Sequence, residues 1–98
     1  MDNKEKLILC TALTKYGIDK QTDMMIEEMS ELTKALLKLR RFTGNISLAP
    51  ALAANVIEEI ADVSIVLEQM RIYFSPTAVD KQKQYKLDRL AKLLGIEG

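Results

Sequence analysis

Apolar residues recur along most of the chain at spacings of three and four, which is the period of an amphipathic α-helix. The stretch from residue 20 to 42 is the clearest case, with apolar side chains at Met25, Met29, Leu32, Leu36 and Leu39. We find no segment whose pattern favours a β-strand. The pattern therefore predicts an all-α protein.

Four helices follow from this periodicity and from the residues that interrupt it. We expect them over residues 4–16, 20–42 and 50–74, and from residue 77 or 78 to 94. Gly17 and Gly95 are placed where glycine commonly ends a helix, and Thr43-Gly44-Asn45 predicts a turn. Asp2 or Asn3 is the expected cap of the first helix. Thr77-Ala78-Val79-Asp80 resembles a capping box at the start of the last helix.

The third helix is apolar around most of its circumference. Its apolar residues are Val56, Ile57, Ile60, Val63, Ile65, Val66, Leu67 and Met70. Such a helix usually lies in the centre of its assembly. With 98 residues the chain is short for a large core, so a second copy would add buried surface. We therefore expect residues 1–98 to form one domain that self-associates through its second and third helices.

The overall composition excludes several classes of function. Lys+Arg and Asp+Glu number 14 each, so the net charge is zero and nothing favours nucleic acid or an anionic membrane as a partner. No stretch approaches the roughly 20 apolar residues of a membrane span. Cys10 is the only cysteine, and we expect it to be buried in a protein of the reducing cytoplasm. Histidine is absent, which excludes histidine-ligated zinc.

The sequence contains two similar acidic motifs, Glu27-Glu28-Met29-Ser30-Glu31 and Glu58-Glu59-Ile60-Ala61-Asp62. Acids three residues apart share a helix face. On a helical wheel, Glu28 flanks the apolar stripe of its helix, Glu31 lies a little further round and Glu27 lies nearer solvent. Glu59 and Asp62 share the side of Val66. If the two faces meet, four carboxylates gather in one place.

Four converging carboxylates without matched cations repel one another, and burial increases the cost. Hard oxygen ligands of this kind suit Mg²⁺ or Mn²⁺. A metal cluster would bridge the acids to a polyanion such as a nucleoside triphosphate and favour hydrolysis of a phosphoanhydride, with Glu27 or Glu58 free to accept a proton from water. Acids on an ordinary solvated helix surface are the competing interpretation, and both stay open at this point.

Three segments resemble the MazG-like, all-α nucleoside triphosphate pyrophosphohydrolases, whose signature is Glu-Glu-x-x-Glu followed after a gap by Glu-x-x-Asp. These segments are residues 16–21, 26–32 and 56–63, and the resemblance extends from about Tyr16 to Leu94. It implies an antiparallel four-helix bundle subunit that forms homodimers or homotetramers. It also implies Mg²⁺ as cofactor, with Mn²⁺ as an alternative, and cleavage of a triphosphate between the α and β phosphorus atoms.

Carried over by position, the resemblance assigns the metal ligands to Glu28, Glu31, Glu59 and Asp62. It assigns catalytic roles to Glu27 and Glu28, with Glu27 orienting or activating water. The expected phosphate-binding residues are Lys38, Lys83 and Lys86. The chain departs from the family pattern at Val66 and lacks tryptophan, so the base is not predicted. A non-catalytic module that binds nucleotide and metal, or a helical interaction module, is the alternative function.

Overall fold

The computed structural model describes residues 2–42 and 50–97. Four α-helices make up almost all of these residues: α1 (Asn3–Tyr16), α2 (Ile18–Arg41), α3 (Pro50–Phe74) and α4 (Pro76–Leu94). No strand occurs in the described ranges, so the all-α prediction is confirmed. The predicted turn at Thr43-Gly44-Asn45 lies outside them. Among the described helices, none combines the length and the apolar character that crossing a bilayer requires.

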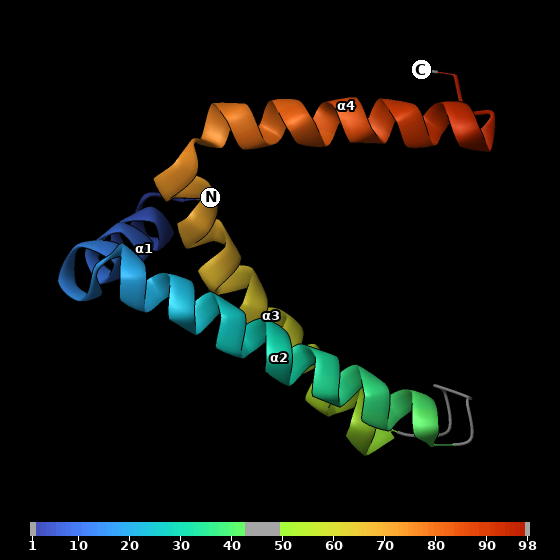
Figure 1. Cartoon of the computed structure of the whole chain (residues 1–98), viewed down its shortest axis with the longest axis horizontal. Coiled ribbons are helices and arrows are strands. Elements are labelled where there is room, and N and C mark those ends of the chain that lie inside the picture. Colours follow the sequence, from blue (N-terminus) through green and yellow to red (C-terminus); the bar gives the residue numbers. More distant parts are fainter. Residues whose placement is uncertain (1, 43–49, 98) are drawn as a thin grey trace.

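The helices α2 and α3 lie side by side and form the body of the molecule (Figure 1). Their shared core contains Ala35, Leu39 and Val56, with Leu32 and Leu52 packed against it. Towards the other end, the Thr22 hydroxyl lies 3.9 Å from the Met70 sulfur. Residue numbers therefore rise along one helix as they fall along the other, and this register determines which acids can meet.

The first helix packs against one end of this pair and buries Leu9. Asp2 caps it, since its carboxylate accepts a hydrogen bond of 2.7 Å from the Glu5 backbone N–H. Gly17 has a φ of 85°, which suits glycine, and its N–H donates to the Leu13 carbonyl. The same glycine accepts the N–H of Gln21 and so starts α2. For this reason α2 begins at Ile18, two residues before the predicted start.

A sharp elbow at Ser75 joins α3 to α4. The Ser75 hydroxyl accepts the Ala78 backbone N–H at 3.1 Å, so Ser75 is the cap and α4 begins at Pro76. The predicted capping box at Thr77-Ala78-Val79-Asp80 is therefore wrong. Ser75 has a φ of 155°, which is unfavourable for a residue with a side chain. The Arg71 guanidinium bridges the elbow and donates to Asp80 at 2.8 Å and to Glu68 at 2.6 Å.

The last helix extends away from the α2–α3 pair, and none of its residues is buried (Figure 1). The radius of gyration is 16.7 Å, whereas a compact domain of about 100 residues has one of roughly 13 Å. The described residues of a single chain therefore do not close a four-helix bundle.

Candidate metal centre

Three carboxylates converge at the middle of the α2–α3 pair. Glu28 comes from α2, and Glu59 and Asp62 come from adjacent turns of α3. Each of the three residues offers one carboxylate oxygen, and these oxygens all lie within 4.8 Å of one another. Glu59 and Asp62 meet Glu28 because their spacing of three places both on the face of α3 that packs against α2.

The acids in this cluster destabilise one another when they are ionised. Partial burial raises the pKa of Glu28, and the charges of Asp62, Glu59 and its other acidic neighbours raise it further. Burial likewise raises the pKa of Glu59, with Asp62 and Glu31 adding to the effect. None of the ion pairs formed within residues 2–42 and 50–97 involves Glu28, Glu59 or Asp62. No lysine or arginine in the described ranges therefore pairs directly with these three carboxylates.

The geometry fits a small hard cation. In an octahedral Mg²⁺ site, adjacent oxygen ligands are about 3.0 Å apart and opposite ones about 4.2 Å, since each Mg–O distance is about 2.1 Å. The three carboxylate oxygens lie within 4.8 Å of one another, so rotamer changes that bring them closer would let all of them bind one ion. Mn²⁺ takes the same kind of oxygen ligand. Glu28, Glu59 and Asp62 could hold the metal directly.

The fourth predicted ligand, Glu31, lies outside this group of three. Its carboxylate is exposed, and one oxygen lies 3.9 Å from the Lys34 ammonium nitrogen. It is nevertheless close enough for its charge to raise the pKa of both Glu28 and Glu59. A rotation of the side chain away from Lys34 is needed before Glu31 can join the cluster. Its role as a ligand stays a prediction.

Glu27 and Glu58 are both exposed. Glu27 borders an open depression of about 530 Å³ whose other lining residues are Tyr16, Lys20, Gln21, Asp23 and Met24. It is adjacent in sequence to Glu28 and does not belong to the carboxylate cluster. Glu27 thus has access to solvent beside the candidate site, which a residue that accepts a proton from water needs.

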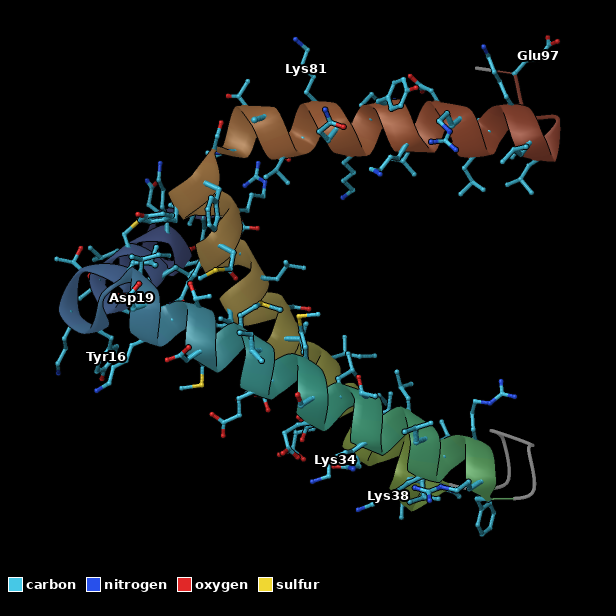
Figure 2. All side chains as sticks on the ribbon, viewed as in Figure 1. Tyr16, Asp19, Lys34, Lys38, Lys81 and Glu97 are labelled. Carbon is cyan, nitrogen blue, oxygen red and sulfur yellow. The ribbon has the colours of Figure 1, made fainter. Side chains whose placement is uncertain are left out.

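The three predicted phosphate-binding lysines lie in two different regions. Lys38 is exposed on α2, beyond Lys34 towards the end of the helix (Figure 2). Lys83 and Lys86 are exposed on α4, and Lys83 lines a groove at the elbow. None of the three forms an ion pair with the carboxylate cluster within the described parts of one chain. Their phosphate-binding role stays a prediction.

A groove at the α3–α4 elbow was not predicted from the sequence. It is open, has a volume of about 710 Å³ and lies between the end of α3 and the start of α4. Leu67, Phe74 and Val79 line it, together with Arg71 and the acids that Arg71 contacts. The sequence does contain a signal for this contact across the elbow. Glu68 and Arg71 are three residues apart, a proline follows them, and Asp80 lies in the first turns of the next helix.

Comparisons of this chain with family models, with curated proteins and with solved structures find no match. The likeness to MazG-like pyrophosphohydrolases therefore stays a prediction from the acidic motifs. What the structure adds is the position of those acids. They lie on two helices that pack together, and three of them converge.

Proposed function

We propose that this protein is a Mg²⁺-dependent nucleoside triphosphate pyrophosphohydrolase, which converts a nucleoside or deoxynucleoside triphosphate and water into the monophosphate and pyrophosphate. One observation carries the proposal: Glu28, Glu59 and Asp62 converge without a cationic partner in the described chain. Such a cluster is costly unless a cation neutralises it. The resemblance of the acidic motifs to the MazG-like family supports the same chemistry.

Glu28, Glu59 and Asp62 would hold the metal, with Glu31 as a further ligand. Bound Mg²⁺ would neutralise phosphate charge and lower the pKa of a water molecule. Glu27 would accept the proton of that water as its oxygen attacks the α-phosphorus. The bond from this phosphorus to the bridging oxygen then breaks, and pyrophosphate leaves. Lys38, Lys83 and Lys86 would bind phosphate oxygens.

The proposal includes a cytoplasmic protein whose partner is a small nucleotide, without nucleic acid or membrane. It also includes an antiparallel four-helix arrangement completed by self-association into a homodimer or homotetramer. Removal of non-standard nucleotides is a physiological role consistent with this chemistry.

Product analysis on a panel of triphosphates tests the proposal. With Mg²⁺ present, ³¹P NMR should show pyrophosphate and a monophosphate, because cleavage falls between the α and β phosphorus atoms. Glu28→Gln and Asp62→Asn should each abolish turnover, whereas Asp19→Asn, on the exposed first turn of α2, should not. Turnover that is unchanged in both site variants, or release of orthophosphate, would refute it.

A second candidate function is a non-catalytic module that binds metal and nucleotide beside a partner protein. The observation that favours it is α4, a 19-residue amphipathic helix none of whose residues is buried in the single chain. In that case Mg²⁺ and nucleotide should raise the melting temperature while no triphosphate in the panel is hydrolysed.

A further inference from the structure

The depression that Glu27 borders lies at the corner where α1 passes into α2, and we call it the corner pocket. Its volume of about 530 Å³ falls within the range of roughly 300–1,000 Å³ that is typical of pockets for small ligands. Tyr16, the last residue of α1, lines it. Gln21 of α2, which is only 7% exposed, also lines it. The corner pocket thus combines an aromatic residue with a buried polar one.

The corner pocket shares a face of α2 with Glu31, at the edge of the carboxylate cluster. Residues that are four, seven and eleven positions apart lie on one face of a helix. The residues of α2 with this spacing are Lys20, Met24, Glu27 and Glu31. Figure 2 shows Tyr16 on the same side of α2 as Lys34, which contacts Glu31. A ligand in the pocket can therefore extend along this face to the carboxylate cluster.

The spacing between the pocket and the cluster suits a nucleoside. Gln21 and Glu28 are seven residues apart, which corresponds to a rise of about 10.5 Å along the helix. A nucleotide whose phosphates lie at the cluster would extend its sugar and base over about this distance. The phosphates themselves do not suit the pocket, since its lining contains the acids Asp23 and Glu27 and one lysine, Lys20. The neutral end of a nucleotide is the occupant that these charges favour.

The Tyr16 ring offers one face to such a ligand. The ammonium nitrogen of Lys15 lies over the ring, 5.5 Å from its centroid, and covers the other face. Because the ring is 50% exposed and lines the pocket, a base would stack on the face opposite Lys15. Stacking on an aromatic ring tolerates any base, since every base has a π face. Tyr16 therefore supplies affinity for a base and no selectivity among bases.

Selectivity requires directional hydrogen bonds, and two amides are positioned to provide them. Gln21 and Gln69 are the buried polar residues of the described chain. The contact between Thr22 and Met70 places both amides at the same level of the α2–α3 pair. The amide oxygen of Gln69 has no hydrogen-bond partner among the described residues, which is costly for a buried acceptor. If Gln21 donates one N–H to this oxygen, its second N–H and its own oxygen remain for a ligand in the pocket.

We propose that the corner pocket binds the nucleoside of the triphosphate, with the base stacked on Tyr16 and its polar edge hydrogen-bonded to Gln21. The ligand class is a nucleobase that has a donor and an acceptor on one edge, which complements the amide of Gln21. Gln69 is a positioning residue, because its oxygen fixes the orientation of that amide. The direction of the nucleotide rests on the proposed function, since that function places the phosphates at the carboxylate cluster.

Isothermal titration calorimetry of the full chain with two kinds of ligand tests the pocket. One ligand is inorganic tripolyphosphate, which lacks a nucleoside. The others are the α,β-methylene analogues of the four common deoxynucleoside triphosphates, which resist the proposed cleavage. With Mg²⁺ present, Tyr16→Ala should weaken nucleotide binding about 10-fold or more and leave tripolyphosphate binding unchanged. Tyr16→Phe keeps the ring and should bind as the wild type does, as should Tyr85→Ala, which removes an exposed tyrosine of α4.

The same titrations separate the pocket from the proposed activity. A wild type that binds none of these ligands, or a Tyr16→Ala variant that binds nucleotide and tripolyphosphate with equal losses or with none, overturns the pocket. A wild type that binds nucleotides as expected but hydrolyses no triphosphate refutes the proposed activity and leaves the pocket in place. Turnover in which Tyr16→Ala leaves KM unchanged does the opposite, since lost base stacking should raise KM while kcat stays level.

Gln21→Leu tests the source of base selectivity. The wild type should bind the four analogues with dissociation constants that span at least about 10-fold, and Gln21→Leu should remove most of that span. Gln69→Leu should act in the same direction, and both variants should bind tripolyphosphate normally and keep their stability, because an apolar side chain replaces a buried amide. Gln84→Leu, at an exposed position of α4, is the control. A wild type without base preference, or a preference that survives Gln21→Leu, overturns the role of Gln21.

Discussion

The helices α2 and α4 are both amphipathic, yet of these two only α2, which pairs with α3, has buried apolar residues in the described chain. Leu39 and Val56 are buried where α2 meets α3, whereas α4 contains no buried residue at all. The helices α2 and α4 share a sequence pattern and differ in their partners. A three–four periodicity shows that a helix needs a partner, but it does not say whether that partner belongs to the same chain.

The largest expected effect is on the stability of the α2–α3 core. Leu39→Ala removes a side chain that is only 5% exposed and should lower the free energy of unfolding by about 2–5 kcal/mol. Leu37→Ala is the control on the same helix, since Leu37 is exposed and its loss should change the stability by less than about 0.5 kcal/mol. Urea unfolding monitored by circular dichroism measures both.

The corresponding change in α4 sharpens this contrast. The effect of Leu39→Ala should not depend on protein concentration, because its partners lie in the same chain. Leu90→Ala should lower stability mainly through dimerisation, so its effect should depend on concentration. If both variants behave alike at every concentration, the distinction between the two regions is wrong.

Glu59→Gln should affect activity strongly while leaving the fold intact. Even residues that only support metal ligands cost about 10–100-fold when removed, so loss of a ligand should reduce pyrophosphate release at least about 100-fold. The free energy of unfolding should stay level or rise, because a repulsive carboxylate is lost. Steady-state kinetics and urea unfolding of one preparation test both statements. A variant that is less stable but fully active would assign Glu59 to the fold alone.

The helix boundaries could be predicted largely from local chemistry. The bounds of α3 are those predicted, and α1 ends at Tyr16 because Gly17 terminates it. The start of α2 could not be placed, since Gly17 both ends one helix and begins the next. Nor could that of α4, because Ser75 and Thr77 are both good caps and the choice depends on the unusual φ of Ser75.

The candidate site was predictable only in part, because it depends on how two helices align. The wheel places Glu28, Glu59 and Asp62 beside apolar stripes, and the α2–α3 register brings them together. The same wheel does not determine whether Glu31 turns towards the cluster or towards Lys34. The ion pair across the elbow joins residues nine apart, Arg71 and Asp80, and periodicity does not reveal it.

The pH dependence of stability should distinguish the α2–α3 pair, which contains the carboxylate cluster, from α4. The pKa values of Glu28 and Glu59 are raised, so the folded state binds their protons more tightly than the unfolded state does. Their contribution to stability is full below a pH of about 4.5 and is lost as the pH rises through the raised values. The melting temperature of the metal-free protein should therefore fall over this range.

Mg²⁺ should reverse this loss at neutral pH. A tenfold excess over its dissociation constant adds about 1.4 kcal/mol to the free energy of unfolding. In the double variant Glu28→Gln/Glu59→Gln, differential scanning calorimetry should show neither the response to pH nor the response to Mg²⁺. Stabilisation of that variant by Mg²⁺ would place the ion elsewhere in the protein.

The smallest effect is expected at the ion pair that joins the two regions. Hydrogen bonding to the Arg71 guanidinium lowers the pKa of Asp80. The contribution of ionised Asp80 to stability is therefore present above a pH of about 3.8, and it is lost as the pH falls through the lowered pKa. Asp80→Asn should lower the melting temperature only slightly at neutral pH, because the Asp80 side chain is 56% exposed.

Asp88→Asn, on the same helix, is the control for this variant, since Asp88 accepts a hydrogen bond from Gln84 within α4 and does not bridge the elbow. Sedimentation of Asp80→Asn adds a sharper comparison. If the exposed leucines of α4 drive the proposed self-association, Asp80→Asn should still dimerise while Leu90→Glu does not. If the two variants dissociate alike, the angle that Arg71 and Asp80 impose on the elbow controls whether α4 can reach a second copy.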